Sequence, residues 1–265
     1  MEKNLLKSNY NTYFLFLIIF IILSIFRIYN VNYDQLWWDE IITLYSADPS
    51  LTFNETINRN FELELSPPTF NLIMKYFYSF FGYNTFSGRY FSVFLGILTC
   101  LVISLTIFDL TKKNFSYLLF GLFISGINVS LISTSQEMRL YSLLIFLVSA
   151  SIFFFCKVIK EQSFKKRIFL LVPFFLFTLS SIFVQPFSIS IFFVFAIYAF
   201  VNSIKKRSYI NEINICVILL FLPTFFYYYF IYINKINLFL YPDSLGDQLN
   251  LKFISNLYFS KYFGS

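Results

Sequence analysis

Long uncharged apolar runs alternate with short charged segments along most of the chain. A membrane-spanning helix needs about 20 consecutive apolar residues. The short alternating segments of a membrane barrel are not the pattern here. The chain is therefore predicted to be an all-α, polytopic membrane protein. Its expected spans are about seven, over residues 12–30, 88–108, 115–134, 141–157, 168–184, 187–204 and 213–233.

One further apolar segment, Pro67–Phe81, has a different length. At about 15 residues it is short for a span. It begins with the sequence Ser66-Pro67-Pro68 and ends at Gly82, which are typical start and stop signals of a helix. We expect a helix that lies in the membrane interface.

The charges orient the predicted spans. Cytoplasmic loops of membrane proteins carry an excess of lysine and arginine. The segments that alternate spans place on the side of the N-terminus hold 12 of the 20 basic residues, and ten of the 14 acids fall on the other side. The pattern predicts a multi-pass protein of the cell membrane with a cytoplasmic N-terminus. It divides the chain into a transmembrane domain, 1–233, with a first outer loop at 31–87, and the start of another outer loop, 234–265.

Composition narrows the possible chemistry. Hydrophobic residues make up 58% of the chain and charged residues 13%. The net charge of +6 is explained by the basic residues that orient the protein in the membrane, so it does not indicate a nucleic-acid partner. The partner expected around the helices is membrane lipid. There is no histidine, which removes the commonest metal ligand and the commonest general base.

The first candidate group for chemistry is Asp39 and Glu40, which follow Trp37 and Trp38 just after the first span. Adjacent side chains point in different directions on any regular element. We therefore expect one acid to face a site while the other holds a backbone or a cation. The alternatives are a solvated acid pair in a loop and an aromatic belt at the membrane surface.

Two further groups lie on the same predicted outer side. Glu62 and Glu64 precede the two prolines, and on an extended segment both would face one side. The turn before the fourth span carries Glu137, Arg139 and Tyr141. Arginine suits bidentate recognition of a phosphate or a carboxylate. The alternatives are a solvated loop for the first group and an internal Glu137–Arg139 ion pair for the second.

Together the three groups suit the transfer of a chemical group from a lipid phosphate on the outer side of the membrane. A carboxylate can deprotonate an acceptor hydroxyl, and a cation can stabilise the departing phosphate. Aromatic faces such as Trp38 can hold a sugar or a prenyl chain.

This ordered set of motifs resembles the GT-C membrane glycosyltransferases of the protein-O-mannosyltransferase and aminoarabinose-transferase type. The resemblance covers most of residues 10–205. The matching segments are LWWDEIITLYSA with Asp39 and Glu40, SPPTFNLIMKYFYSFFG with Pro67 and Pro68, GRYFSVFLGILTC with Arg89, and SQEMRLYSLL with Gln136, Glu137, Arg139 and Tyr141.

The resemblance implies transfer of a sugar from a polyprenyl-phosphate donor, with inversion at the anomeric carbon and the lipid phosphate as leaving group. Asp39 corresponds to the general base, with Glu40 grouped beside it as catalytic. Acceptors in such a reaction include a protein hydroxyl, a glycolipid and a cell-wall polymer. The substrate-binding residues expected on these grounds are Trp38, Glu64, Pro67, Pro68, Arg89, Glu137, Arg139 and Tyr141.

The chain also departs from this family. Many relatives have a histidine or another polar residue at the position of Ser66, and many have a histidine where this chain has Gln185. No cofactor is therefore expected with certainty, although acids alone can hold a hard divalent cation. Relatives are usually longer, so a fragment, a truncated product or a half-size relative is expected. The alternative functions are a transporter or flippase for a lipid-linked saccharide and an inactive membrane paralogue.

Overall fold

The described part of the chain is mostly helical, with turns and short loops between the helices. The computed structural model describes residues 2–33, 35–64, 66–111, 113–206 and 212–239, and no strand occurs among them. It forms two compact units, Met1–Thr224 and Phe225–Ser265. The helices are α1 (Glu2–Ile28), α2 (Trp38–Ser46), α3 (Phe53–Leu63), α4 (Thr69–Phe81), α5 (Thr85–Leu110), α6 (Phe115–Ile127), α7 (Val129–Gln136), α8 (Leu140–Lys160), α9 (Phe164–Val184), the 3-10 turn η1 (Pro186–Ser188), α10 (Ile189–Lys206) and α11 (Glu212–Phe239).

Three helices, α5, α8 and α9, are long and apolar enough to cross a membrane. The consecutive helices α6 and α7 meet the same criteria together, with a bend of 58° between them. The described residues thus hold three or four candidate spans, and seven are not confirmed. The other predicted spans are helical, but their apolar described parts hold only 10–17 residues each: Tyr13–Ile28, Pro186–Val201 and Ile213–Tyr229.

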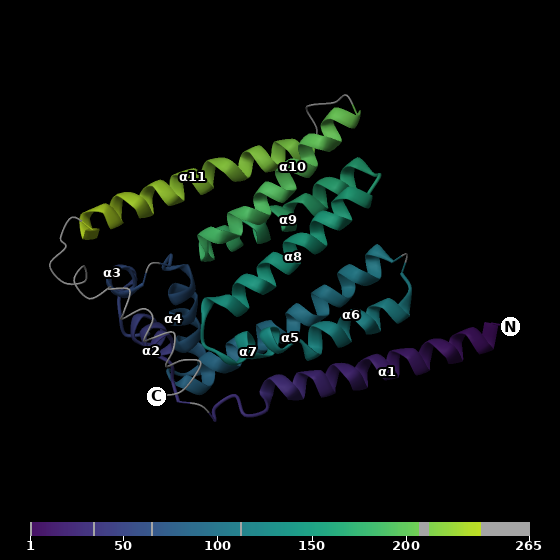
Figure 1. Cartoon of the computed structure of the whole chain (residues 1–265), viewed down its shortest axis with the longest axis horizontal. Coiled ribbons are helices and arrows are strands. Elements are labelled where there is room, and N and C mark those ends of the chain that lie inside the picture. The colour runs from purple at the N-terminus through teal and green to yellow at the C-terminus, as the bar shows by residue number, and fades with distance from the viewer. Residues whose placement is uncertain (1, 34, 65, 112, 207–211, 240–265) are drawn as a thin grey trace, which may run out of the picture. The chain divides into compact units, whose positions relative to one another are not determined.

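The first unit is organised around α5. This helix packs against α6 on one side and α8 on the other, and α8 packs against α9 (Figure 1). Glycines allow the close approach of neighbouring helices, since a Cβ on Gly96 would collide with Ser135 and one on Gly126 with Leu23. Small residues serve this purpose where helices pack within a bilayer.

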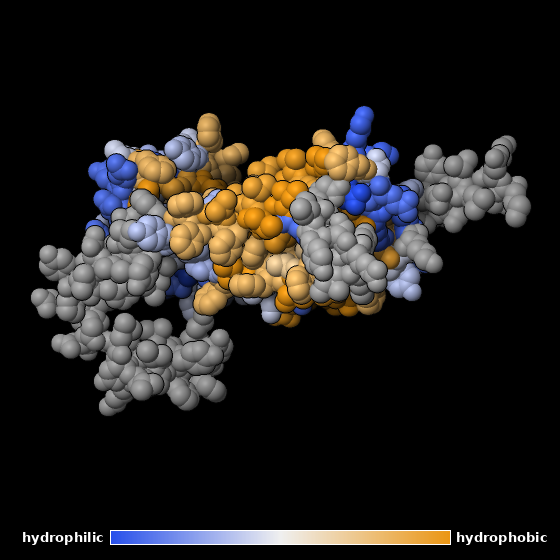
Figure 2. All heavy atoms as spheres, turned by 90° about the horizontal axis from the view of Figure 1, so that it is seen from above, coloured by the Kyte–Doolittle hydropathy of each residue, from blue (hydrophilic) through white to orange (hydrophobic). Residues whose placement is uncertain are grey.

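Large apolar side chains remain exposed along the outer faces of these helices. Phe94 is 58% exposed and Leu176 is 56% exposed. On the face drawn in Figure 2, hydrophobic side chains gather over the middle of the molecule and hydrophilic ones gather toward two ends. Exposed apolar surface on this scale is unusual for a water-soluble monomer and is compatible with a lipid environment.

The bend between α6 and α7 is supported by polar contacts. The Asn128 side chain accepts a hydrogen bond from the Leu131 backbone N–H (3.0 Å) and so begins α7. The buried Arg27 donates to the carbonyls of Ser125 (3.0 Å) and Gly126 (2.9 Å), the last turn of α6. Carbonyls released by such a bend need partners, and Arg27 supplies them from α1.

The predicted first outer loop folds into three helices. α2, α3 and α4 gather at one end of α5 and α8 (Figure 1). The helix predicted over Pro67–Phe81 is confirmed: α4 begins directly after Pro68 and ends at Gly82, whose φ of 92° suits glycine.

Two predictions about chain conformation are wrong. Glu62 does not lie on an extended segment beside Glu64, because α3 continues through Leu63 and only Glu64 is extended. A capping box of Thr52 and Glu55 starts this helix, with the Thr52 N–H to Glu55 carboxylate distance at 2.7 Å. The loop predicted from residue 234 is helical to Phe239, and 240–265 lie outside the described residues.

Candidate functional site

Asp39 and Glu40 point in different directions from the first turn of α2. The side chain of Asp39 is 59% exposed, whereas that of Glu40 is 0% exposed. Adjacent residues of a helix project about 100° apart, so one of them turns to the interior and the other to the surface. The two carboxylates therefore have different environments, as expected from their spacing.

Glu40 is held by four hydrogen bonds below the surface. Arg89 on α5 donates from Nη2 to Oε2 (2.7 Å) and from Nε to Oε1 (3.0 Å). The backbone N–H groups of Met138 (2.8 Å) and Trp37 (3.2 Å) donate to the same carboxylate. Glu40 thus connects α2 to the first turns of α5 and to the segment between α7 and α8.

These contacts decide the protonation of Glu40. Burial by itself disfavours the charged form and would raise the pKa of this carboxyl. The hydrogen bonds from Arg89, Met138 and Trp37, together with the charge of Arg89, outweigh burial and hold the pKa of Glu40 below its ordinary value. Glu40 is therefore a buried carboxylate that is ionised at neutral pH.

Arg89 is equally enclosed. Its side chain is 5% exposed, and it also donates to the carbonyls of Val31 (2.8 Å) and Gln35 (3.3 Å). The direct roles predicted for Glu40 in catalysis and for Arg89 in substrate binding remain predictions. In this arrangement both groups are buried and bonded to each other, and they position the segment that carries Asp39.

Arg139 brings the three sequence groups together. Its Nη2 lies 3.2 Å from Asp39 Oδ2 and its Nη1 lies 3.0 Å from Glu64 Oε1. Asp39 comes from α2, Glu64 ends α3, and Arg139 precedes α8. We call these three residues the Arg139 cluster. Two carboxylates face one guanidinium, so the cluster formally carries one negative charge.

Glu64 is fixed more firmly than Asp39. Its side chain is 12% exposed, and its second oxygen accepts a hydrogen bond from the Ser66 hydroxyl (2.5 Å). Pro67 and Pro68 are buried just beyond it. The hydroxyl of Thr69 then donates to the Phe183 carbonyl on α9 (2.8 Å). The double proline thus directs the chain from Glu64 into α4.

Aromatic faces lie exposed near the cluster. Trp38 is 71% exposed and Tyr141 is 40% exposed. The guanidinium carbon of Arg139 lies 5.7 Å from the centre of the Tyr141 ring, within the range of a cation–π contact. Glu137 is partly buried and accepts a long hydrogen bond from the Ser133 hydroxyl (3.5 Å).

The sequence did not reveal the roles of Met138 and Gln136. Met138 acts through its backbone N–H, which carries no side-chain signal, and its side chain is fully buried. The amide of Gln136 donates to the carbonyls of Arg27 (3.2 Å) and Tyr29 (2.9 Å) at the end of α1. Its place in the matched motif was the only hint of this contact.

The described residues contain no group of three or more His, Cys, Asp or Glu side chains placed to hold a metal ion. The cation that lies between the Asp39 and Glu64 carboxylates is the guanidinium of Arg139. An exposed carboxylate beside a positively charged group can accept a proton from a hydroxyl while the neighbouring charge stabilises an anion.

Comparison of the chain with protein-family models, curated proteins and solved structures found no match.

Proposed function

We propose that this chain is a membrane glycosyltransferase of GT-C type. It moves a sugar from a polyprenyl-phosphate donor to an acceptor hydroxyl on the extracytoplasmic side of the membrane. The observation that carries the proposal is the Arg139 cluster, in which three motifs far apart in the sequence meet through two ion pairs. The cluster lies at one end of the apolar helices, where a lipid-linked donor presents its phosphate.

In the proposed reaction, Asp39 is the general base. The acceptor oxygen attacks the anomeric carbon, its proton passes to Asp39, and the bond from that carbon to the phosphate oxygen breaks. The polyprenyl phosphate leaves with the electron pair. Asp39 suits this role because more than half of its side chain is exposed, whereas Glu40 is closed to a substrate.

Arg139 supports the leaving group. Its guanidinium is oriented by Glu64 and by the Tyr141 ring, and it exchanges its exposed contact with Asp39 for the donor phosphate. Arginine binds phosphate through paired N–H groups. Release of Asp39 in the same step frees that carboxylate to accept the proton, so donor binding and base activation are coupled.

The remaining residues define the surroundings of this reaction. Trp38 and Tyr141 offer exposed aromatic faces to a sugar or prenyl chain. Glu137 lies beside Arg139 on the same turn, and Pro67 and Pro68 direct the loop that holds Glu64. We further propose the seven-span topology with a cytoplasmic N-terminus, since the basic segments lie away from this end of α5 and α8.

A transfer assay tests the proposal. Native membrane vesicles with matched amounts of protein are supplied with radiolabelled polyprenyl-phosphate sugars. Wild type is expected to release sugar from the lipid, and Asp39→Asn is expected to lose that activity with unchanged protein level. Glu62→Gln is the matched control, because it makes the same chemical change at an exposed acid of α3. Equal transfer by Asp39→Asn and wild type would show that Asp39 is not the base.

A transporter of lipid-linked saccharides is a second candidate, favoured by the 58° bend between α6 and α7. Broken helices with polar groups at the break are typical of transporters, and Arg27 lies at this one. The same vesicles distinguish the two functions. A transporter moves the labelled lipid-linked sugar to the opposite leaflet without cleaving it, and Asp39→Asn leaves the sugar on its lipid as wild type does.

A further inference from the structure

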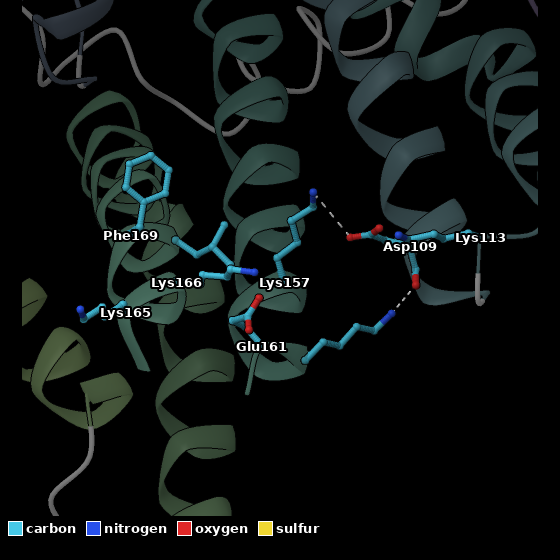
Figure 3. A pocket seen from close by; sticks show the side chains of 9 residues that line it. Asp109, Lys113, Lys157, Glu161, Lys165, Lys166 and Phe169 are labelled. Carbon is cyan, nitrogen blue, oxygen red and sulfur yellow. Dashed lines mark hydrogen bonds and ion pairs between the residues drawn. The ribbon is translucent and has the colours of Figure 1, made fainter. Parts of the chain in front are cut away.

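A second polar site lies at the opposite end of the helices that carry the Arg139 cluster. A pocket of about 850 Å³ opens where α5 and α8 end and α9 begins (Figure 3). Arg89 and Asp109 are 20 residues apart on α5, which corresponds to about 30 Å of helix at a rise of ~1.5 Å per residue. That length matches the hydrocarbon thickness of a bilayer, so the buried Arg89–Glu40 pair and the pocket lie about one membrane thickness apart along α5.

The pocket is strongly basic. Two of its acids, Asp109 and Glu161, face five lysines, which leaves a formal charge of +3. The lysines are Lys113, Lys157, Lys160, Lys165 and Lys166. A phosphate-bearing group is the natural counter-charge for such a site.

Two of the lysines are already engaged by α5. Lys157 Nζ lies 3.8 Å from the Asp109 carboxylate, and Lys160 donates to the Asp109 backbone carbonyl. These contacts fasten the last turns of α8 and α5 together, as the dashed lines in Figure 3 show. Glu161 accepts a hydrogen bond from the Ser163 N–H (2.9 Å) at the start of α9.

The other three lysines remain available. Lys113, Lys165 and Lys166 are exposed, and within the described part of the chain none of them forms an ion pair. Lys165 and Lys166 lie on the side of the pocket away from Asp109 (Figure 3). The preference for basic residues in cytoplasmic loops explains lysines in these segments. It does not explain their convergence on one pocket from α8, α9 and the turn after α5.

An apolar stripe leads away from the pocket along α9. Phe169 lines the pocket and is 77% exposed. Val172 (55% exposed) and Leu176 (56% exposed) follow at intervals of three and four residues, which places all three on one face of the helix. A ligand with a charged head and an apolar tail fits this arrangement better than a free anion does.

We propose that the pocket binds the phosphate headgroup of an anionic phospholipid. Lys113, Lys165 and Lys166 contact the phosphate, and an acyl chain lies along Phe169, Val172 and Leu176. Basic pockets between membrane helices bind anionic headgroups, with each nearby lysine adding to the attraction. This site is separate from the proposed transfer reaction, and its occupancy does not depend on that activity.

Lipid binding to the detergent-solubilised full chain tests the proposal. Native mass spectrometry measures retention of phosphatidylglycerol and of phosphatidylcholine with the same acyl chains. Wild type is expected to bind phosphatidylglycerol about tenfold more tightly, and the triple variant Lys113→Gln, Lys165→Gln, Lys166→Gln is expected to lose that preference. The matched control is Lys205→Gln, Lys206→Gln, Arg207→Gln, which removes the same charge from another basic segment and is expected to retain it.

Two further arms separate a lipid site from a phosphate site. Phe169→Ala is expected to weaken phosphatidylglycerol binding, whereas millimolar inorganic phosphate is expected not to displace the lipid. Displacement by phosphate alone would overturn the lipid assignment. Equal binding of the two lipids by wild type would overturn the site itself, and this comparison needs no variant to fold. Equal loss of preference in the pocket and control variants would show attraction to net charge rather than a site.

Discussion

The guanidinium of Arg89 donates to both oxygens of the Glu40 carboxylate, at 2.7 and 3.0 Å, with the two side chains 5% and 0% exposed. This buried ion pair fastens α2 to the second turn of α5. Through the Met138 N–H, the same carboxylate also holds the segment that ends in Arg139. The positions of Asp39 and Arg139 therefore depend on a buried ion pair.

Removal of one partner of this pair is expected to destabilise the protein strongly. Arg89→Gln leaves the Glu40 charge buried without its counter-charge, a change that typically costs about 3–5 kcal/mol of folding free energy. Thermal unfolding in detergent measures the loss. Arg59→Gln is the control, since Arg59 donates to the Tyr45 carbonyl (3.1 Å) and lies over the Tyr45 ring near the surface, and it should cost about 1 kcal/mol or less. Similar stability of the two variants would mean that the buried pair contributes little.

The ion pair also predicts a dependence of stability on pH. The pKa of Glu40 is lower in the folded protein than its ordinary value of 4.5. The ionised Glu40 therefore contributes fully to the free energy of unfolding above pH 4.5, and this contribution is lost as the pH falls through the folded-state pKa. Unfolding temperatures measured from pH 7 downward should fall below pH 4.5 in wild type and fall less steeply in Glu40→Gln.

Other acids also contribute to the fall of the unfolding temperature below pH 4.5. Hydrogen bonds from Ser50 to Asp48 and from Thr52 to Glu55 lower the pKa of each of these exposed carboxyls as well. The difference between wild type and Glu40→Gln, rather than the absolute slope, therefore isolates Glu40. Parallel pH curves would contradict the lowered pKa.

Arg139 is expected to matter for both transfer and stability. Its pair with Asp39 is largely solvated on the Asp39 side, and exposed pairs contribute about 1 kcal/mol or less, whereas its pair with Glu64 is 14% and 12% exposed and costs more to break. Loss of a group that stabilises developing charge typically lowers the rate about 100-fold or more. Arg139→Ala should show this loss in the vesicle assay, mainly as poorer use of donor. Arg139→Lys keeps the charge without the planar fork and should fall between Arg139→Ala and wild type.

Gly88 is expected to resist substitution because of its neighbours. A Cβ at this position would collide with the Met138 side chain and the Tyr78 hydroxyl, which are themselves in contact (2.5 Å). Gly88→Ala should therefore cost about 1–3 kcal/mol through overpacking and displace the Met138 N–H from Glu40. The cost should shrink in a Met138→Ala background, since coupled neighbours are not additive. Additive effects in thermal unfolding would show that Met138 is not the obstacle.

Local patterns in the sequence were sufficient for much of the helical structure. Hydrophobic runs predicted apolar helices in the right places, and the Pro-Pro start and Gly82 stop predicted α4. The pattern did not show the bend at Asn128, because hydrophobicity alone does not show where a helix bends, and of its seven spans the described residues hold three or four candidates. It also missed that α3 extends to Leu63, since its polar sequence resembles a loop.

By itself the sequence determined where the apolar helices and α4 lie, that Asp39 and Glu40 diverge, and which motifs carry charge. Only the tertiary structure decided that Glu40 is the buried acid and that its partner is Arg89, 49 residues away. It also decided that Arg139 pairs with Asp39 and Glu64, residues that come from two other helices. Helix formation and hydropathy are properties of neighbouring residues. The pairing of charges depends on which helix ends packing brings together, and on which of two adjacent acids then faces the interior.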